Sequence, residues 1–304
     1  MSTATKRIVL AQIAPGLGML KENIERHLEI VSDARKNKAD VVVFPELSLT
    51  GYQLKDLVAD VALMQGEVLD LFKLLGEGKS IEVVLGYMER STGFQYYNAM
   101  AHIVINSSGR VRLLHNHRKI NLPTYGMFEE QRYYSQGKNL NAYNSTSIGR
   151  CGMLVCEDFW HPANTLLLSL DSQGLEGVKA VFVGANSPAR GVTAGNTEPA
   201  NSTTWKLMAR HTAMVCNCLV VICHRVGVED GFVFVGGSEI LAPGGKEICR
   251  APLFEENILT CDIQVDALVR EGRIMFPGGS IDDYELLERE LDRIRKDHLT
   301  GEQK

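Results

Sequence analysis

Apolar and polar positions along this chain form blocks that predict strands and helices in alternation. Short apolar runs bounded by turn residues are typical of buried strands, and apolar side chains spaced three or four residues apart are typical of helices that cover a sheet. In residues 23–36, Ile24, Leu28 and Val31 fall on one helical face. The predicted helices are 23–36, 58–75, 163–170 and 205–214, and the predicted strands are 7–12, 41–46, 81–88, 98–105, 110–114, 152–156, 180–184, 219–224, 237–241 and 259–262. This order predicts an α/β layered sandwich.

The chain is predicted to form a single domain followed by a helical extension. Its 304 residues, 45% of them hydrophobic, suffice for one large core, and no linker-like change in composition interrupts residues 1–279. Residues 280–304 differ, because Ser280 and Asp283 have the spacing of a capping box ahead of a charged stretch. One face of that stretch carries the apolar residues Tyr284, Leu287, Leu291 and Ile294. We expect this extension to pack on its own domain or on a partner subunit.

Charge and cysteine content narrow the class of protein. A net charge of -5 argues against nucleic acid or an anionic membrane as the main partner. No apolar stretch is long enough to span a bilayer, and the N-terminal residues lack a signal-peptide pattern. Without an export signal, seven cysteines predict reduced thiols in a cytoplasmic protein rather than a disulfide framework. Cys216, Cys218 and Cys223 are interpreted as buried strand residues and not as a metal site, because no second pair at zinc spacing follows.

Three chemically active side chains lie at predicted strand ends or strand–loop junctions. Glu46 closes the apolar run 41–46, Cys156 closes the run 152–156, and Lys119 stands just before a loop that contains proline and glycine. Side chains at strand ends of α/β sheets commonly meet ligands. Taken singly, Glu46 could cap the next element, Lys119 could be a solvated charge, and Cys156 could be a buried structural thiol. Their coincidence favours one site built around a nucleophilic thiol.

The motifs around these residues resemble those of the nitrilase superfamily, the carbon–nitrogen hydrolases with a Glu-Lys-Cys triad. The resemblance covers nearly the whole chain and rests on four motifs: Phe44-Pro45-Glu46 with Leu49-Thr50-Gly51-Tyr52, Arg118-Lys119 with Leu122-Pro123, Phe128-Glu129-Glu130-Gln131-Arg132-Tyr133-Tyr134 with Gly137, and Val155-Cys156-Glu157-Asp158. It implies a four-layer αββα sandwich of the nitrilase type, in which Glu130 supports the lysine and the backbone N–H of Glu157 donates to an oxyanion. Since family members associate through sandwich faces and exchange C-terminal segments, it also implies a homodimer or a higher homo-oligomer.

The chemistry expected of these residues is hydrolysis of a C–N bond without a metal or an organic cofactor. A free thiol has a pKa of about 8.5, so it needs a base to form the thiolate at neutral pH. Glu46 is the predicted base, and Cys156 is the predicted nucleophile. Lys119 and the N–H of Glu157 are the predicted oxyanion donors. A thioester would form as ammonia leaves, and Glu46 would then activate the water that releases the carboxylic acid.

The expected substrate is a small linear amide. Candidates for substrate binding come from the loops after the strands, namely Tyr52, Tyr125, Phe128, Trp160, Asn186, Ser187 and Arg190. Residues 156–162 and 186–188 resemble the glutaminase domains of glutamine-dependent NAD synthetases more than carbamoyl amidases, which favours a primary amide whose carboxylate end is held by Arg190. Because no ATP-pyrophosphatase domain follows residue 304, the chain is expected to be a free-standing amidase or a glutaminase that serves a separate synthetase subunit.

Other functions remain open at the level of sequence. An N-carbamoyl amine or amino-acid amidohydrolase is the nearest alternative, and a nitrile-hydrolysing enzyme or an acyltransferase would use the same thioester chemistry. An alternative of another class is a catalytically silent scaffold or binding partner. The intact set of Glu46, Lys119 and Cys156 favours an enzyme, because a silent protein would be free to lose any of the three.

Overall fold

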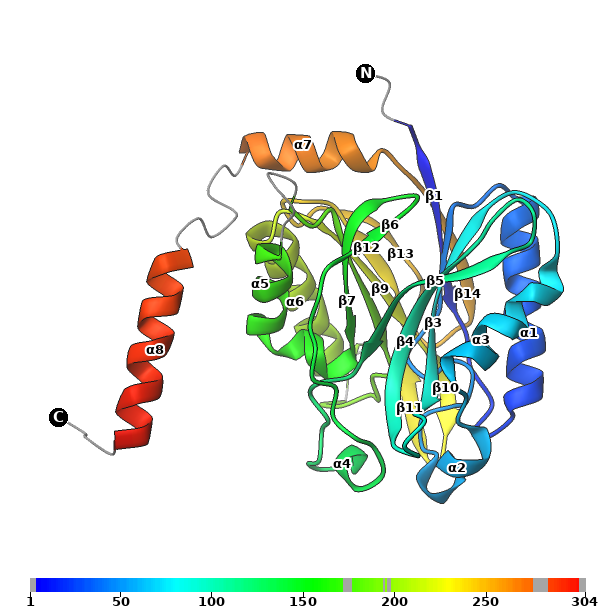
Figure 1. The fold of residues 1–304 in the computed structure, drawn as a ribbon, viewed down its shortest axis with the longest axis horizontal. Helices are drawn as coiled ribbons and strands as arrows, with labels where there is room; N and C mark the ends of the chain where they lie inside the picture. The colour runs from blue at the N-terminus through cyan, green and yellow to red at the C-terminus, as the bar shows by residue number, and fades with distance from the viewer. Residues whose placement is uncertain (1–3, 172–176, 194, 196–197, 276–283, 301–304) are drawn as a thin grey trace.

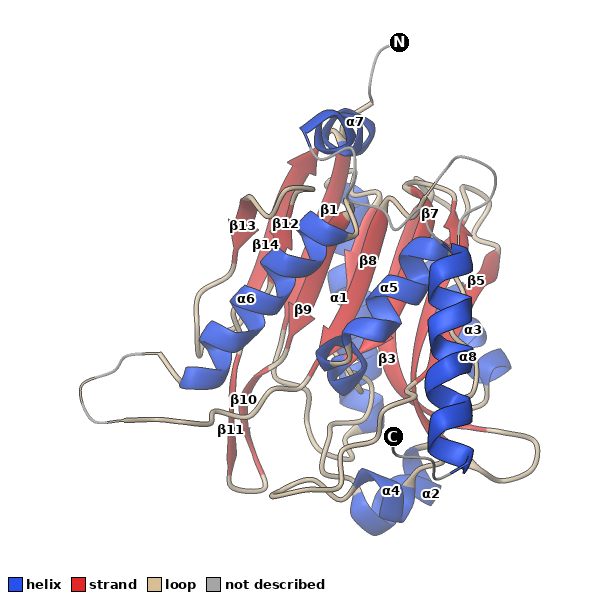
Figure 2. Ribbon diagram, turned by 90° about the vertical axis from the view of Figure 1, so that its left-hand side faces the viewer, coloured by secondary structure: helices blue, strands red, loops and turns tan. Residues whose placement is uncertain are grey.

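The computed structural model describes residues 4–171, 177–193, 195, 198–275 and 284–300. Two six-stranded sheets stack face to face, and helices cover the outer face of each sheet (Figures 1 and 2). The layers therefore follow the order helix, sheet, sheet, helix. This arrangement confirms the predicted αββα sandwich.

The first sheet has the strand order β14-β1-β2-β3-β4-β5. Its strands are β1 (Lys6–Gln12), β2 (Val41–Val43), β3 (Ile81–Arg90), β4 (Tyr96–Ile105), β5 (Val111–Arg118) and β14 (Asn257–Ile263). Strands β1, β2 and β3 run parallel, and the other neighbours pair antiparallel. The helices on this side are α1 (Leu20–Lys36) and α3 (Gln65–Phe72), with the short helices η1 (Lys55–Leu57) and α2 (Val58–Val61) before α3 and η2 (Lys73–Leu75) after it.

The second sheet has the strand order β13-β12-β9-β8-β7-β6. Its strands are β6 (Tyr143–Ser145), β7 (Gly149–Val155), β8 (Ala180–Ala185), β9 (Leu219–His224), β12 (Glu239–Leu241) and β13 (Glu247–Arg250). Helices α5 (Pro162–Leu170) and α6 (Ala200–Val215) cover it, as Figure 2 shows. A separate hairpin pairs β10 (Val226–Glu229) with β11 (Phe232–Val235). The hairpin and strands β6 and β13 were not predicted from the sequence.

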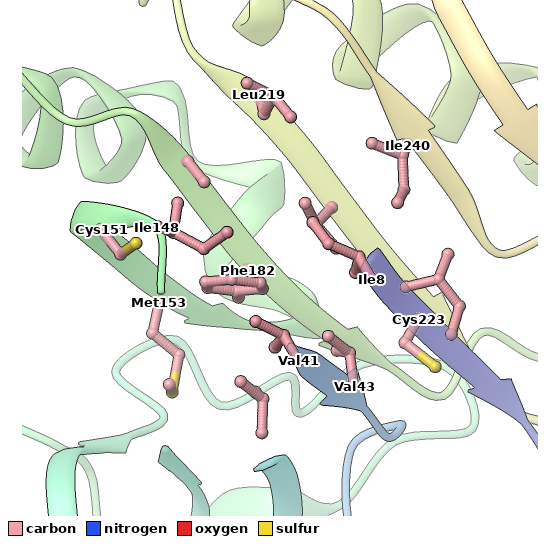
Figure 3. Packing of buried hydrophobic residues seen from close by; sticks show 14 of the residues in the cluster. Ile8, Val41, Val43, Ile148, Cys151, Met153, Phe182, Leu219, Cys223 and Ile240 are labelled. Atoms are coloured by element: carbon pink, nitrogen blue, oxygen red, sulfur yellow. The ribbon is translucent and has the colours of Figure 1, made fainter. Parts of the chain in front are cut away.

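Alternation along the strands divides their apolar side chains between two cores. On β2, Val41 and Val43 belong to the core between the sheets, whereas Val42 packs in the core beneath α1. Figure 3 shows Val41 and Val43 in the inter-sheet core, which also holds Ile8 from β1 and Phe182 from β8. Valine suits such a strand because its branched side chain packs well on a pleated surface that is buried on both faces. The two cores together fix where the carboxyl end of β2 lies.

The predicted helix 58–75 is wrong in its middle, where the chain leaves α2 and enters α3. Leu63 is extended there and joins the edge of β3. Its N–H donates to the Met88 carbonyl and its carbonyl accepts from the Arg90 N–H, both at 2.9 Å. These two bonds satisfy main-chain groups that the helix would otherwise have satisfied. The apolar spacing suited one continuous helix, so the hydrophobic pattern contained no sign of the break.

The expectation that all seven cysteines are reduced thiols is wrong for one pair. Cys249 on β13 and Cys261 on β14 form a disulfide, and the other five cysteines are free. Strand β13 lies at the edge of the second sheet and β14 at the edge of the first, so the bond joins the two sheets. The two cysteines lie only 12 positions apart in the sequence. Nothing in the hydrophobic pattern predicts the strand that carries Cys249, so the pairing could not be predicted either.

The C-terminal part of the chain is helical. Helix α7 (Val265–Met275) follows β14, and helix α8 (Tyr284–Thr300) occupies the region in which a helical extension was predicted. The capping box expected at Ser280 and Asp283 lies outside the described residues. The domain boundary at residue 279 stays a prediction.

Candidate active site

Glu46 lies, fully buried, in the turn that follows β2. This turn passes directly over β3, where a Cβ atom on Gly86 would stand 2.3 Å from the nitrogen of Leu47. It also approaches β8, where a Cβ atom on Gly184 would stand 2.9 Å from the nitrogen of Glu46. Glycine at both positions therefore allows the turn to bring a carboxylate to the place where the two sheets meet.

Two asparagines hold the Glu46 carboxylate in place. Asn98 on β4 donates from Nδ2 to Oε1 at 2.7 Å, and the backbone N–H of Asn186 donates to Oε2 at 2.8 Å. The side chain of Asn186 donates in turn to the main-chain carbonyl of Glu46 at 3.0 Å. The backbone N–H and Nδ2 of Asn186 thus support Glu46, its main-chain carbonyl accepts from the Cys156 thiol, and its Oδ1 is buried without a hydrogen-bond partner, so its predicted role in substrate binding stays a prediction. Asn98 was missed, although a fully buried asparagine in an apolar strand is a signal that could have identified it.

Lys119 lies immediately after β5 and is fully buried, which excludes the alternative of a solvated surface charge. Its Nζ donates to Oε1 of Glu46 at 2.8 Å and to Oε1 of Glu130 at 2.7 Å. Burial by itself lowers the pKa of this ammonium, but the charges of Glu130 and Glu46 outweigh burial and raise the pKa well above its ordinary value. Lys119 is therefore a permanent cation between two carboxyl groups.

Glu130, the first residue of α4 (Glu130–Tyr133), is the second carboxyl group of this cluster. Its Oε1 also accepts a hydrogen bond of 2.7 Å from the hydroxyl of Tyr52. Burial raises the pKa of Glu130 to about 7, with Lys119 opposing and Glu46 adding to the rise. The cluster thus holds one cation and two carboxyl groups, of which Glu130 can take up a proton near neutral pH.

Cys156 is the first residue of the helical turn η3 (Cys156–Trp160), directly after β7. Its φ of +46° lies in the left-handed region, which a residue with a side chain adopts only when its surroundings force it to. The thiol donates weakly to the Asn186 carbonyl at 3.8 Å. Burial and the charge of Glu46 raise the pKa of the thiol well above its ordinary value, and Lys119 lowers it. The side chain rests as a thiol and needs a base before it can attack.

The predicted pocket residues Tyr125, Phe128, Trp160 and Arg190 come together beside this cluster. The Arg190 guanidinium carbon lies 5.5 Å from the ring centre of Phe128 and 5.7 Å from that of Trp160. The hydroxyl of Tyr125 donates to the carboxylate of Glu157 at 3.1 Å. These four residues and Glu157 are called the pocket wall below; they place a cation, Arg190, and an anion, Glu157, around Tyr125. The position of the Glu157 side chain was missed, because the motif resemblance implies a role only for its backbone N–H.

The structure does not bring Ser187 into this group of pocket residues. Its hydroxyl accepts hydrogen bonds from Asn201 Nδ2 and Trp205 Nε1 of α6, both at 2.9 Å, and the residue is buried. Ser187 therefore anchors the loop after β8 to α6. Tyr52 does lie at the pocket, where it packs edge-on against Phe128 and bonds to Glu130.

Comparison with known proteins identifies the family. The family model described as carbon-nitrogen hydrolase matches residues 7–271. This chain belongs to the carbon–nitrogen hydrolase family. Within curated proteins, this hydrolase is 32% identical to a glutamine-dependent NAD(+) synthetase of Thermotoga maritima over 268 residues, which are 87% of the chain and 43% of the relative. It is 30% identical to the corresponding synthetase of Acinetobacter baylyi, over 86% of the chain and 44% of the relative.

Solved structures with a similar fold include complete hydrolases and part of a larger enzyme. A carbon-nitrogen hydrolase from Helicobacter pylori superposes with a TM-score of 0.79 at 21% identity, covering 97% of this chain and 99% of that one. A glutamine-dependent NAD+ synthetase from Acinetobacter baumannii superposes with a TM-score of 0.72 at 28% identity, covering 87% of this chain and 46% of that one. The chain thus spans less than half the length of the synthetases that it resembles.

Two further properties of the hydrolase concern what it could bind. Across the described parts of the chain, no group of three or more histidine, cysteine or acidic residues is arranged to hold a metal ion. No helix among the described residues is long and apolar enough to cross a membrane.

Proposed function

We propose that this protein is an amidase that releases ammonia from a small linear ω-amide of the glutamine class, through a thioester on Cys156. The observation that carries the proposal is the position of the half-buried Cys156 thiol beside the charges of Glu46 and Lys119, with the cation Arg190 and the anion Glu157 nearby around Tyr125. The thiol supplies the nucleophile, and the pocket wall supplies the selectivity.

Acylation begins when Glu46 accepts the proton of the Cys156 thiol. The sulfur then attacks the amide carbon, and a C–S bond forms while the carbonyl oxygen becomes an oxyanion. Lys119 and the backbone N–H of Glu157 donate to that oxyanion, which develops charge only in the transition state. Protonated Glu46 returns its proton to the amide nitrogen, the C–N bond breaks, and ammonia leaves behind a thioester.

Deacylation uses the same carboxylate a second time. Glu46 accepts a proton from water as the water oxygen attacks the thioester carbon. The tetrahedral intermediate collapses with loss of the Cys156 sulfur, which takes the proton from Glu46 and returns to the resting thiol. The products are a carboxylic acid and ammonia, and the enzyme ends the cycle with the protons it started with.

Lys119 can serve both steps because two carboxyl groups hold it. Its Nζ lies 2.8 Å from Glu46 and 2.7 Å from Glu130. When Glu46 is protonated during the cycle, Glu130 still compensates the buried ammonium, so Lys119 stays charged and oriented. Such fixed donors act strongly in a site that excludes water.

The pocket wall favours an amide that carries both an ammonium and a carboxylate. Arg190 would bind the carboxylate, and Glu157, whose carboxylate also accepts from Tyr125, would bind the ammonium. An N-carbamoyl amino acid, the nearest alternative substrate, has the carboxylate but lacks the ammonium, so it would make no use of the Glu157 charge. The similarity to enzymes named glutamine-dependent supports the same choice.

The test compares ammonia release from glutamine, glutaramate and N-carbamoyl amino acids. Glutaramate is glutamine without its amino group, so it isolates the contribution of Glu157. We expect Glu157→Gln to lower kcat/KM about 10- to 100-fold on glutamine and to change it little on glutaramate, since one charge-assisted hydrogen bond contributes about 1.5–3 kcal/mol. Arg190→Met should lower kcat/KM on both. A wild-type preference for N-carbamoyl amino acids, or ammonia release that persists in Cys156→Ala, would refute the proposal.

We further propose that the protein acts as a homodimer or a higher homo-oligomer, and that its ammonia can serve a separate synthetase subunit. The outer helices leave large apolar side chains exposed, among them Leu167 on α5 and Leu207 and Met214 on α6. A concave patch of about 230 Å³ next to them is lined by Phe159, Trp160, Pro162, Leu207, Met208, His211 and Thr212. Sedimentation velocity on the wild type and on Leu207→Asp tests the oligomer; a monomeric wild type would contradict it.

A further inference from the structure

A single buried carboxylate joins the two chain segments that carry Lys119 and Cys156. It belongs to Asp158 in η3, which is fully buried and receives four hydrogen bonds. Its Oδ1 accepts from the backbone N–H groups of Ile120 at 3.0 Å and Asn121 at 2.7 Å, and its Oδ2 accepts from His117 Nε2 at 2.8 Å and from the backbone N–H of Val155 at 3.2 Å. Four donors saturate a carboxylate, so this group is held rigidly.

The donors lie immediately around the two reactive residues. His117 and Ile120 stand on either side of Lys119 in the sequence, and Val155 directly precedes Cys156. Because all of them bond to one rigid group, the main chain at Lys119 cannot shift relative to the main chain at Cys156 without breaking charge-assisted hydrogen bonds.

A second tie connects the same segments. Asn164 of α5 donates from Nδ2 to the side-chain oxygen of Asn121 at 2.8 Å and to the main-chain carbonyl of Asp158 at 2.9 Å. The segment that begins at Asn121 continues to the pocket loop and to Glu130. The hydrogen bonds of Asp158 and Asn164 therefore also fix the start of the loop that forms the pocket wall.

We propose that Asp158 is a positioning residue, which sets the Cys156 thiol and the Lys119 ammonium against the same substrate carbon. This inference rests on the hydrolysis proposed above and names a residue that the mechanism does not use. Cys156 is held at a φ of +46°, a conformation that persists only where neighbouring structure determines it. Misplacing reacting groups by about 1 Å can lower a rate about 100-fold. Losing the carboxylate should therefore slow chemistry at the thiol more than it weakens substrate binding.

The chain offers a matched control for a purely structural role. Glu82 on β3 is also a buried carboxylate with several donors, including Ser145 Oγ at 2.6 Å and the Ser147 N–H at 2.7 Å. Glu82 pairs across from Val41 at the start of β2, whereas the active-site turn leaves the other end of that strand. Replacing Glu82 by glutamine removes a buried charge away from the thiol, and replacing Asp158 by asparagine removes one beside it.

The experiment measures Asp158→Asn, Glu82→Gln and wild type in the full-length protein by three readouts. The first readout is the rate at which iodoacetamide alkylates Cys156, measured by peptide mass spectrometry. The second is kcat and KM for the amide substrate, and the third is the melting temperature. We expect Asp158→Asn to lower kcat at least about 10-fold with KM changed less than about threefold, and to change the alkylation rate by about 10-fold. Glu82→Gln should leave both rates within twofold of wild type, whatever it does to the melting temperature.

The inference is overturned if Asp158→Asn alkylates and turns over within twofold of wild type, or if Glu82→Gln shows the same loss as Asp158→Asn. Alkylation needs no substrate, so it decides the inference even if the wild type hydrolyses no amide in the panel, an outcome that would instead refute the proposed function. If Asp158→Asn does not fold, a pair of variants at His117 decides. His117→Gln keeps a donor and should restore what His117→Leu loses; equal, wild-type rates in both would overturn the inference.

Discussion

Replacing Lys119 by methionine should destabilise the protein in a way that depends strongly on pH. The substitution removes the ammonium and leaves Glu46 and Glu130 as two buried carboxyl groups that had shared it at 2.8 and 2.7 Å. Breaking a buried ion pair by removing one partner costs about 3–5 kcal/mol. At about 2–4 °C per kcal/mol, this corresponds to a melting temperature about 6–20 °C lower than wild type at pH 8.

The pH dependence follows from the carboxyl group that gains a proton. Burial already raises the pKa of Glu130 to about 7 although Lys119 lowers it, so removing Lys119 raises the pKa further. An unfolded glutamate titrates at about 4.3. Between these two pKa values the folded variant binds more protons than the unfolded chain, so its stability falls as pH rises, by about 1.4 kcal/mol per pH unit for one proton. Wild-type Glu130 also holds its proton up to about pH 7, so both proteins share this fall from pH 5 to 7. Lys119→Met should lose further stability relative to wild type between pH 7 and 8, where only its Glu130 still keeps the proton.

The assay is urea unfolding at pH 5, 6, 7 and 8 for wild type, Lys119→Met and the double variant Lys119→Met/Glu130→Gln. The Glu130→Gln substitution removes the titrating group. The double variant should therefore lose most of the extra pH dependence and be more stable than Lys119→Met at pH 8. Two results would show that the two carboxyl groups do not share the lysine as described. One is a stability of Lys119→Met that follows the wild-type pH profile from pH 5 to 8, and the other is a double variant that is no more stable than Lys119→Met at pH 8.

Three shorter predictions concern the cysteines. Cys156→Ser should lower ammonia release at least about 100-fold while keeping the fold, because a hydroxyl is much harder to deprotonate; near-normal turnover would remove the cysteine from its proposed role. Iodoacetamide should label Cys156 more slowly at pH 7 than at pH 9, because burial and Glu46 raise the pKa of its thiol, and a flat pH profile by mass spectrometry would contradict this. Reducing the bond between Cys249 and Cys261 should cost about 2–4 kcal/mol of stability and leave kcat unchanged; a Cys249→Ser/Cys261→Ser variant serves as the control, and a melting temperature indifferent to reductant would argue against the bond.

The strand-end rule allowed the sequence to predict the cluster of Glu46, Lys119 and Cys156. Glu46 and Cys156 end apolar runs and Lys119 lies at a strand–loop junction, and the sheets bring these three strand ends together. The layered α/β architecture could be predicted for a similar reason, since buried strands such as β2 and β8 consist of uninterrupted apolar residues. Motif resemblance supplied what spacing could not, namely the sandwich of two sheets and the support by Glu130.

Contacts between segments far apart in the chain could not be predicted in this way. Asn98 lies 52 residues from Glu46 in the sequence, and Asp158 lies 41 residues from His117, so no local pattern links the members of either pair. The direction of side chains in loops could not be predicted from the sequence either: Ser187 follows Asn186 directly, yet its hydroxyl bonds to α6. Even where local signals exist, as in the helix predicted over 58–75, pairing with a neighbouring strand overrode them.

The backbone of Cys156 limits which nucleophiles this scaffold can ever use. At a φ of +46° a side chain branched at Cβ collides with its own main chain, whereas cysteine, serine and alanine can be placed there at moderate cost. Threonine, which like cysteine and serine serves in nature as a nucleophile on amides, therefore cannot replace Cys156 in this turn. Evolution could exchange sulfur for oxygen here by a single substitution to serine, but a threonine enzyme would require the strand to end in a different way.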